Sequence, residues 1–372
     1  MINGFQMIFS EKEKNKITKN IRRVLDSGMV IDHDFHGKLR SNLKSLTGKK
    51  FCDFSSSNTM ISEILYRVLD WENIIFQGNM FVSPIFASRR AGMKIEFVDI
   101  ELETLGMNLN NLKSINLNNK LLCMMHTGGI ISKNTKEIVE YSHLNNSIVI
   151  EDCAQSFGSK YDDIHCGTIG DYGVFSFAST KIFTSINGGA VVHNGREIHD
   201  QIHAYTNCGK RTPFGEQVCD YEGFSARLTE IQSSILCGLD LNWRLNTRKK
   251  CAEIYNDYLS PFEGDVIRKI YHYKENNNYR FFILFCEGFN ITSLEEYAES
   301  EGWMFSPPVF RELPYKTPVF NNQFKDVMLP NAEYFSGHHV CLPVHEGMSE
   351  NDSVYVAKSL VKFMNEIKNI KI

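Results

Sequence analysis

The sequence predicts an α/β fold, in which helices cover a mixed, mostly parallel sheet in a three-layer large domain, followed by a smaller α+β domain. At 372 residues the chain exceeds what one hydrophobic core usually serves, so we expect two domains. From about residue 50 to residue 200, short β-rich runs alternate with helical stretches, which is typical of strands joined by covering helices. After about residue 265 this alternation ends.

The large domain is predicted to begin with an amphipathic helix over residues 11–28, because apolar residues recur there at helical spacing. The β-rich runs that follow lie at residues 95–99, 121–125, 147–151, 173–177 and 190–192. Ligands of such sheets usually bind beyond the carboxyl ends of the strands. The residues that directly follow these runs are therefore candidates for a binding site.

The second half of the chain is predicted to contain a long helix over residues 226–259, interrupted near Asn242. We interpret its basic cluster, which consists of Arg244, Arg248, Lys249 and Lys250, as a solvated helix face. A strand at 279–286, a helix at 294–302, a proline-rich loop at 305–318 and a closing helix at 349–367 complete the chain. We divide it into residues 1–245 and 246–372, and expect the N-terminal helix to join the smaller domain in space.

The composition fits a soluble cytoplasmic protein. Hydrophobic residues make up 42% and charged residues 23% of the chain, and the net charge of -4 gives no reason to expect a nucleic-acid partner. No apolar run approaches the roughly 20 residues that span a bilayer, and the N-terminus lacks the layout of a signal peptide. The ten cysteines form no C-x-x-C pair, which favours reduced thiols over disulfides or a metal site.

Two apolar runs end next to residues that carry chemistry. Asp152 closes the first run, and Lys181 follows the second run 29 positions later. A carboxylate at the end of an apolar strand needs a partner. Many enzymes hold pyridoxal phosphate (PLP) with an acid and a lysine in this order, the lysine as a Schiff base with the aldehyde and the acid on the pyridine nitrogen, so that the protonated ring acts as an electron sink. Taken singly, a helix N-cap and a solvated lysine are the alternatives.

Small polar residues offer a place for the phosphate. Residues 54–59 (Phe-Ser-Ser-Ser-Asn-Thr) precede a helical run over 60–69, and hydroxyl residues that open a helix provide both a cap and an anion site. Ser176 would add a hydroxyl, and Phe81 would cover the cofactor ring. The alternatives are a capping box without a ligand and a phenylalanine of the core.

Together these motifs resemble the PLP-dependent sugar-nucleotide aminotransferases of the DegT/DnrJ class, a branch of the fold-type I aminotransferases, over roughly residues 20–360. The shared motifs are Asp152 with Ala154-Gln155, the glycine-rich turn 167–173, Phe175-Ser176-Phe177, Thr180-Lys181, Ser57-Asn58-Thr59, His126-x-x-Gly129, Arg227-x-x-x-Ile231-Gln232 and Leu342-Pro343. Each motif alone is weak, whereas the set is specific.

The resemblance implies a role for each candidate. Lys181 would hold the cofactor and move protons between its C4′ atom and the substrate carbon, Asp152 would pair with the pyridine nitrogen, and Gln155 would touch the ring hydroxyl. Asn58, Thr59 and Ser176 would hold the phosphate, and Phe81 would stack on the ring. The reaction would move an amino group from glutamate to a 3- or 4-keto sugar attached to a nucleotide, for polysaccharide or secondary-metabolite sugars. A homodimer with shared active sites is implied.

Three positions depart from the family pattern. Asn58 stands where the family has glycine, Asn187 where it has glutamate, and Ser225 where a second-subunit asparagine reaches the phosphate. These changes leave the lysine chemistry intact but bear on cofactor affinity and on the substrate, so an aminotransferase acting on a non-nucleotide ketone remains an alternative.

Three further functions remain as alternatives. A sugar dehydratase of the same fold would carry histidine in place of Lys181. A nicotinamide-dependent oxidoreductase would show a G-x-G-x-x-G motif before the strand-ending acid, and none is present. A non-catalytic regulator on this scaffold would have lost the pair of Asp152 and Lys181.

Overall fold

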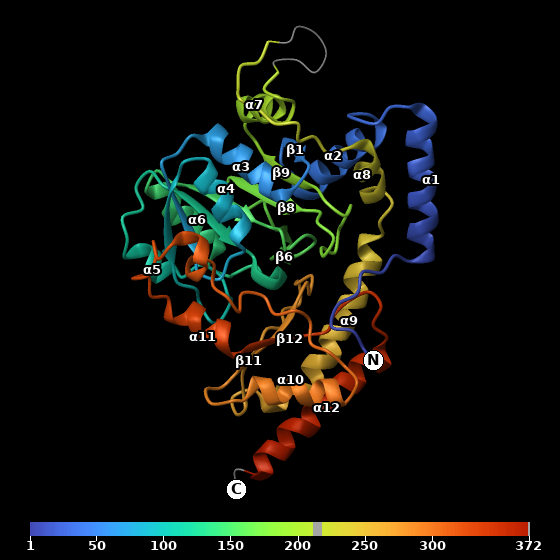
Figure 1. The fold of residues 1–372 in the computed structure, drawn as a ribbon, viewed down its shortest axis with the longest axis vertical. Coiled ribbons are helices and arrows are strands. Elements are labelled where there is room, and N and C mark those ends of the chain that lie inside the picture. Colours follow the sequence, from blue (N-terminus) through green and yellow to red (C-terminus); the bar gives the residue numbers. More distant parts are fainter. Residues whose placement is uncertain (211–217, 371–372) are drawn as a thin grey trace.

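The computed structural model describes residues 1–210 and 218–370, and it is built around a seven-stranded sheet (Figure 1). In spatial order the strands are β1 (Phe51–Ser55), β9 (Gly189–His193), β8 (Tyr172–Ser176), β5 (Ile148–Asp152), β4 (Leu121–Met125), β2 (Asn73–Gln77) and β3 (Lys94–Val98). Strand β9 runs antiparallel to both of its neighbours, and the other neighbouring pairs are parallel. The predicted mixed, mostly parallel sheet is confirmed.

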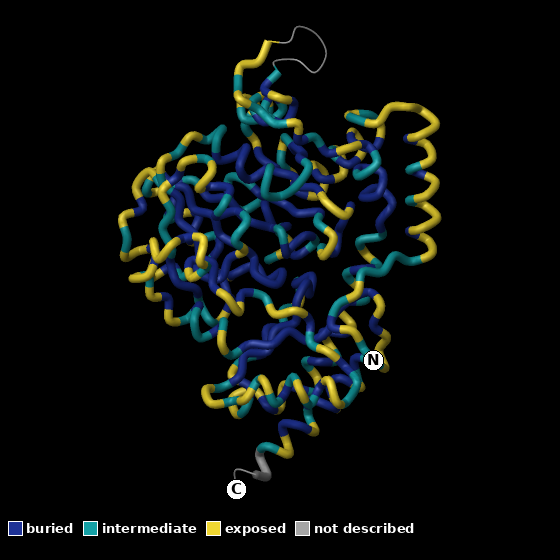
Figure 2. Tube along the Cα trace, viewed as in Figure 1, coloured by how far each residue is buried: buried dark blue, intermediate teal, exposed yellow. Residues whose placement is uncertain are grey.

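Helices cover both faces of this sheet, because its central strands are apolar on both sides. Along β2, Ile74 and Phe76 enter one core and Ile75 the opposite one, and β4 alternates in the same way. The helices of the large domain are α1 (Glu11–Ser27), α2 (Asp34–Thr47), α3 (Asn58–Leu69), α4 (Val82–Arg90), α5 (Leu109–Lys113), α6 (Thr135–Leu144), α7 (Arg196–Thr206) and α8 (Glu230–Leu236). The buried sheet lies between them (Figure 2), which gives the predicted three layers.

The smaller sheet has three antiparallel strands, β10 (Ile267–Ile270), β11 (Phe281–Phe285) and β12 (His339–Leu342). It packs with α9 (Leu241–Leu259), α10 (Ile291–Ser300) and α12 (Glu350–Ile370), while α11 (Pro330–His338) faces the large sheet's core. A short hairpin, β6 (Lys160–Tyr161) and β7 (Ile164–His165), stands apart. The predicted α+β character of the second part is confirmed, whereas its boundary at residue 245 remains a prediction, which falls inside α9.

The prediction that the N-terminal helix joins the smaller domain holds only at its first turn, where Glu13 bonds to Arg244 of α9. Helix α1 packs against α8 in the large domain, and it is the segment before α1 that reaches the smaller sheet. There Ile2 pairs with Trp303, and the Gly4 carbonyl accepts a hydrogen bond from the Ser306 hydroxyl at 2.5 Å. Amphipathicity predicts that one face of a helix is buried, but it does not say against which element.

The long helix predicted over residues 226–259 is interrupted, but earlier than expected. Helix α8 ends at Leu236, and α9 begins at Leu241 with Asp240 as its N-cap, whose side chain accepts from the Trp243 N–H at 3.2 Å. A capping carboxylate satisfies an N–H group that a helix start leaves free. Asp240 therefore marks the interruption better than Asn242 does.

The interpretation of the basic cluster as a solvated face is wrong for two of its four residues. Arg244 and Arg248 have no exposed side-chain surface. Arg244 makes two hydrogen bonds to Glu13 (2.8 and 3.1 Å), and Arg248 makes two to Glu346 (2.8 and 3.2 Å). Such two-pronged pairing compensates for burial of both charges. Lys249 and Lys250 are exposed, as expected.

Removing Arg248 should destabilise the protein strongly, because the Glu346 carboxylate would stay buried without its partner. We expect Arg248→Ala to lower the free energy of unfolding by about 3–5 kcal/mol, measured by urea denaturation. Lys249→Ala is the control, since it removes only an exposed partner of Glu253 at 3.7 Å, worth less than about 1 kcal/mol. Similar losses in the two variants would contradict this account.

Candidate active site

Several of the predicted site residues lie where parallel strands end. Asp152 is the last residue of β5, opposite Met125 of β4 and Val174 of β8, and Ser176 is the last residue of β8. The carboxyl ends of β4, β5 and β8 therefore share one edge of the sheet, and Lys181 follows β8 by five residues. This is the edge at which parallel α/β sheets usually bind ligands.

Asp152 is a buried carboxylate, and only one of its two oxygens accepts a hydrogen bond. The side chain is 2% exposed, and its Oδ1 atom accepts from the Ala154 N–H at 2.9 Å. Its Oδ2 atom is buried and has no hydrogen-bond partner among the described residues. Burial raises the pKa of this carboxyl, although the Ala154 N–H and the Lys181 ammonium oppose the rise. A hydrogen-bond donor at Oδ2, and above all a cationic one, would compensate for this burial.

Lys181 is half-buried beside a tyrosine from the second part of the chain. Its Nζ atom donates to the Tyr279 hydroxyl at 3.4 Å and lies 4.7 Å from the centre of that ring. Thr180 approaches the same hydroxyl at 3.4 Å. Burial alone would raise the pKa of Tyr279, but the charges of Lys181 and Arg280 outweigh it and lower this pKa to about 8. Tyr279 therefore faces the lysine as a hydroxyl that ionises more easily than an ordinary tyrosine.

The residues of the predicted anion site lie at the N-terminus of α3. Ser57 caps the helix by accepting from the Met60 N–H at 3.1 Å, and the Nδ2 atom of Asn58 is buried with no partner among the described residues. Ser176 reaches the same place, because it pairs across β8 and β9 with Gly189. A Cβ on Gly189 would lie only 2.6 Å from the Asn58 nitrogen, so glycine permits this close approach. Free donors, a hydroxyl and a helix N-terminus suit a phosphate.

The other predicted residues are placed as follows. Gln155 is buried, and its Oε1 atom accepts from the Gly128 N–H at 2.7 Å. The Thr59 hydroxyl bonds to that of Ser83, which ties the start of α3 to the start of α4. Phe81 is the N-cap residue of α4 and is 58% exposed, so it is free to cover a ring. Ser225 is exposed and pairs with Asn207, and the carbonyl of the next residue, Ala226, accepts from the Ser56 N–H at 2.7 Å, just before α3.

One buried ion pair escaped the sequence reasoning. The Nε2 atom of His126 lies 2.8 Å from Glu151, whose two oxygens also accept from the N–H groups of Gly167 (2.9 Å) and Gly170 (2.6 Å). Burial opposes both charges, but their contact outweighs it, raising the pKa of His126 and lowering the pKa of Glu151. The signal was a glutamate within an apolar run, directly before Asp152. The pair anchors the glycine-rich turn behind β5.

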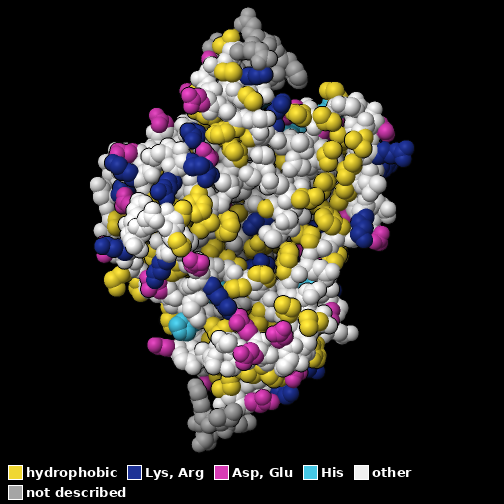
Figure 3. Space-filling model, viewed as in Figure 1, with side chains coloured by type: hydrophobic (Ala, Val, Ile, Leu, Met, Phe, Trp, Pro, Cys, Tyr) yellow, Lys and Arg dark blue, Asp and Glu magenta, His cyan; other side chains and the backbone are white. Residues whose placement is uncertain are grey.

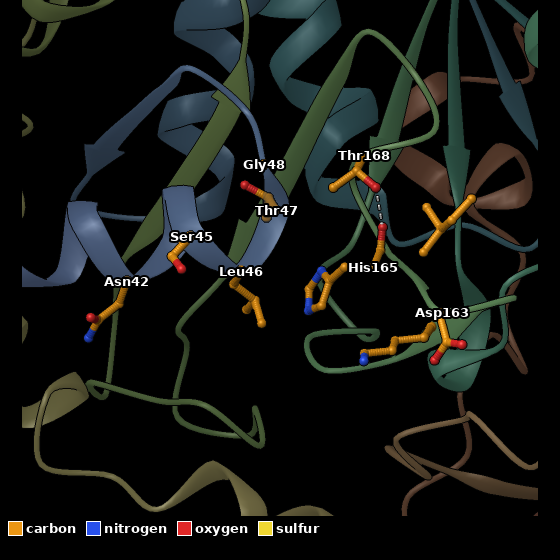
Figure 4. Close-up of a pocket in the computed structure, with 10 residues that line it drawn as sticks. Asn42, Ser45, Leu46, Thr47, Gly48, Asp163, His165 and Thr168 are labelled. Carbon is orange, nitrogen blue, oxygen red and sulfur yellow. Dashed lines mark hydrogen bonds between the residues drawn. The ribbon is translucent and has the colours of Figure 1, made fainter.

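A separate hollow of about 610 Å³ lies between the end of α2 and the β6–β7 hairpin (Figure 4). Asn42 and Leu46 line it from the helix, and His165 and Thr168 line it from the other side, where the Thr168 hydroxyl donates to the His165 carbonyl at 2.6 Å. None of the predicted site residues lines it. The candidate catalytic residues therefore lie at the sheet edge and not in this hollow.

In the described part of the chain, no helix is long and apolar enough to cross a membrane.

The residues at the sheet edge fit PLP. A protonated pyridine nitrogen would supply the cationic donor that Asp152 Oδ2 lacks, and the phosphate would engage the start of α3 and Ser176. Lys181 lies on the loop that follows β8, and its amine would bond to the aldehyde of the cofactor. An α/β fold with a buried aspartate and a lysine in this arrangement defines an enzyme of the PLP-dependent aminotransferase type.

The chain matches the DegT/DnrJ/EryC1/StrS aminotransferase family over residues 11–361. It belongs to this family and is a PLP-dependent aminotransferase, which confirms the predicted family, cofactor and class of enzyme.

Known relatives are distant in sequence but align over most of the chain. The UDP-4-amino-4,6-dideoxy-N-acetyl-beta-L-altrosamine transaminase of Campylobacter jejuni is 24% identical and aligns over 99% of each chain. The GDP-perosamine synthase of Escherichia coli O157:H7 is 25% identical over 80% of this chain and 81% of its own. The structure of Helicobacter pylori PseC, an aminotransferase of pseudoaminic acid biosynthesis, superposes with a TM-score of 0.88, at 21% identity, over 96% of this chain and 98% of its own. The fold-type I architecture is thus confirmed.

The His126–Glu151 pair makes a pH-dependent contribution to stability. Because the pKa of Glu151 is lowered on folding, its stabilising contribution is complete above the ordinary glutamate value of 4.5 and is lost as pH falls below it. Because the pKa of His126 is raised on folding, its stabilising contribution is complete below the ordinary histidine value of 6.5 and is lost as pH rises above it. We expect Glu151→Gln to cost about 3 kcal/mol of unfolding free energy between pH 4.5 and 6.5, and less on either side. Exposed Glu140→Gln is the control, and a pH-independent loss in Glu151→Gln would sink this account.

Proposed function

We propose that this enzyme moves the amino group of glutamate to a keto sugar attached to a nucleotide. The observation that carries the proposal is the buried, half-satisfied Asp152 carboxylate on the same sheet edge as Lys181 and the start of α3. The names of the two relatives supply the class of acceptor, since one transaminase acts on a UDP-linked amino sugar and the other makes GDP-perosamine. In the balanced reaction the donor amine is exchanged for the ketone oxygen, giving 2-oxoglutarate and the amino sugar.

Each residue would contribute one part of this reaction. PLP, when bound, supplies the electron sink that stabilises negative charge at the reacting carbon. Asp152 would keep that sink effective by holding a proton on the ring nitrogen. Lys181 would take a proton from the substrate carbon and return it to the cofactor's C4′ atom, on the other side of the amine nitrogen, and Tyr279, whose hydroxyl lies 3.4 Å from the lysine amine, would orient that amine. Asn58, Thr59 and Ser176 would hold the phosphate, Gln155 the ring hydroxyl, and Phe81 the ring face.

The retained pair of Asp152 and Lys181 also bears on the alternatives. A dehydratase of this fold would carry histidine where this chain has Lys181, and a non-catalytic regulator would not need a half-satisfied acid at the sheet edge. The departures at the phosphate site are compatible with cofactor binding. Asn58 has ordinary helical geometry and does not require the left-handed backbone that favours glycine. The Asn187 side chain accepts from the Gly188 N–H at 3.0 Å and so supports the turn locally.

The assembly that we propose is a cytoplasmic homodimer with shared active sites. Large hydrophobic side chains are exposed at the end of α1 and after Lys181, among them Leu25 (61%), Met29 (48%) and Ile186 (69%). Hydrophobic side chains also gather over α8 on the face shown in Figure 3. Exposed apolar surface of this kind favours association with another protein surface. The ten cysteines are free thiols, which supports a reducing compartment.

Substitution of Lys181 should abolish turnover. We expect Lys181→Ala to release no 2-oxoglutarate from glutamate in the presence of a panel of nucleotide-linked keto sugars, and to lose the visible absorbance of lysine-bound PLP. Lys181→Arg keeps the charge and is expected to fail equally, because a guanidinium does not form the required bond. Exposed Lys160→Ala is the control. Wild-type rates in Lys181→Ala would refute the assignment.

Shared active sites predict complementation between two inactive variants. Lys181→Ala removes the amine of its own site, and Ser225→Glu would place a negative charge at the phosphate of the partner's site. After the two are unfolded and refolded together in equal amounts, about a quarter of wild-type activity should return, since half of the dimers are hybrids with one intact site. No recovery, with hybrid dimers present in native mass spectra, would argue for sites within single subunits.

A further inference from the structure

The loop between β8 and β9 contains an asparagine that is followed by glycine. Asn187 is exposed on this loop, and its Oδ1 atom accepts from the N–H of Gly188 at 3.0 Å. This hydrogen bond brings the side-chain amide group next to the main-chain nitrogen of the following residue. Groups that are held together in this way react as if at very high concentration, and glycine has no side chain to hinder the approach.

Two further hydrogen bonds prepare the same peptide group for reaction. The main-chain carbonyl of Asn187 accepts from the Ser185 hydroxyl at 2.6 Å and from the Nε2 atom of Gln232 at 3.0 Å. When the N–H of Gly188 loses its proton, the negative charge spreads onto this carbonyl oxygen. Donors that already point to a place where negative charge develops lower the barrier to its formation. The Gly188 nitrogen therefore becomes a nucleophile more readily than an ordinary peptide nitrogen.

The chain has two other Asn-Gly pairs for comparison, at residues 3–4 and 194–195. Asn194 is also exposed, but its Oδ1 atom accepts from the main-chain N–H of Lys50 at 3.0 Å. Its amide group is thus held by a different segment of the chain. Of the three pairs, all of which lie within the described residues, only Asn187 bonds to the N–H of the glycine that follows it. The fold therefore favours reaction at this pair over the other two.

We propose that Asn187 is a site of spontaneous deamidation. The Gly188 nitrogen gives its proton to water and forms a bond to the Cγ atom of Asn187, while the bond from Cγ to Nδ2 breaks and ammonia leaves with a proton. Water then opens the resulting cyclic imide at either of its carbonyls, which gives aspartate or isoaspartate. A water molecule is consumed and an ammonia molecule is released, so the reaction needs no oxidant, reductant or second enzyme.

The modification changes the loop that presents Lys181. Isoaspartate adds a main-chain atom where this loop returns to the sheet, directly before the Gly188 carbonyl accepts from the Phe177 N–H at 2.9 Å. The next residue, Gly189, pairs with Ser176 of the predicted phosphate site. Both products also carry a negative charge that asparagine lacks. We therefore expect the deamidated enzyme to lose the visible absorbance of lysine-bound PLP.

Ageing of the PLP-loaded enzyme at neutral pH, followed by tryptic peptide mapping, tests the proposal. Residues 182–196 form one tryptic peptide that contains both Asn187 and Asn194, so mass spectrometry compares the two sites in one sample. We expect Asn187 to convert at least about tenfold faster than Asn194 in the folded enzyme. In enzyme kept unfolded in urea, the two rates should be similar, because the contacts at Asn187 exist only in the folded chain.

Two variants separate the contributions. Ser185→Ala removes one donor to the Asn187 carbonyl and should slow the conversion roughly 3- to 10-fold, whereas Ser185→Thr keeps a hydroxyl and is the control. Asn187→Gln should keep its initial PLP absorbance during ageing, because the longer side chain closes a ring less readily. Equal rates at Asn187 and Asn194 in the folded enzyme, or the same ratio of rates after unfolding, would overturn the proposal. Unchanged absorbance in fully deamidated enzyme would refute the expected effect on Lys181.

Discussion

Two buried arginines on successive turns of α9 hold the functional parts of this molecule together. Arg244 binds Glu13 of α1, the Ile8 carbonyl of the N-terminal segment (3.0 Å) and the Ile182 carbonyl next to Lys181 (3.3 Å). One turn later, Arg248 binds Glu346 and the Val344 carbonyl after β12 (2.9 Å). Because each guanidinium carries five donors in one plane, a single side chain can fix several segments at once. The loop that presents the lysine is thus tied to both parts of the chain.

The features that could be predicted most reliably from the sequence are those that depend on residues close together in the chain. Apolar runs located five of the seven large strands, and Asp152 was a candidate because it closes one of them and is followed by Lys181, whereas Ser176 was a candidate for its hydroxyl near that lysine. Lys181 followed from its distance to a strand end. The burial of Arg244 could not be predicted, because its acid lies 231 positions away. Tyr279 was missed for the same reason, since it meets Lys181 across 98 positions from another sheet.

The errors have physical causes too. A run of basic residues is usually solvated, and α9 breaks this rule because glutamates from distant segments neutralise it. The amphipathic pattern of α1 was interpreted correctly, but its partner was not, because any apolar face can pack on any other. The glutamate before Asp152 contradicted its apolar surroundings, and His126 resolves the contradiction by pairing with it. A charged residue within an apolar run thus indicates a partner elsewhere in the chain, although the sequence does not identify that partner.

The active site depends on how closely the second sheet approaches the first. Gly128 and Gly129 both have positive φ, and a Cβ on either would lie about 2 Å from side chains of the segment that carries Tyr279 and Arg280. Only glycine therefore allows that segment to dock on the turn after β4, where the Arg280 N–H meets the Gly128 carbonyl at 3.4 Å. The same turn bonds to Gln155 at 2.7 Å. The large sheet, through β4 and β5, and the smaller sheet, through β11, are thereby joined at one pair of glycines, so a side chain there would separate the two sheets.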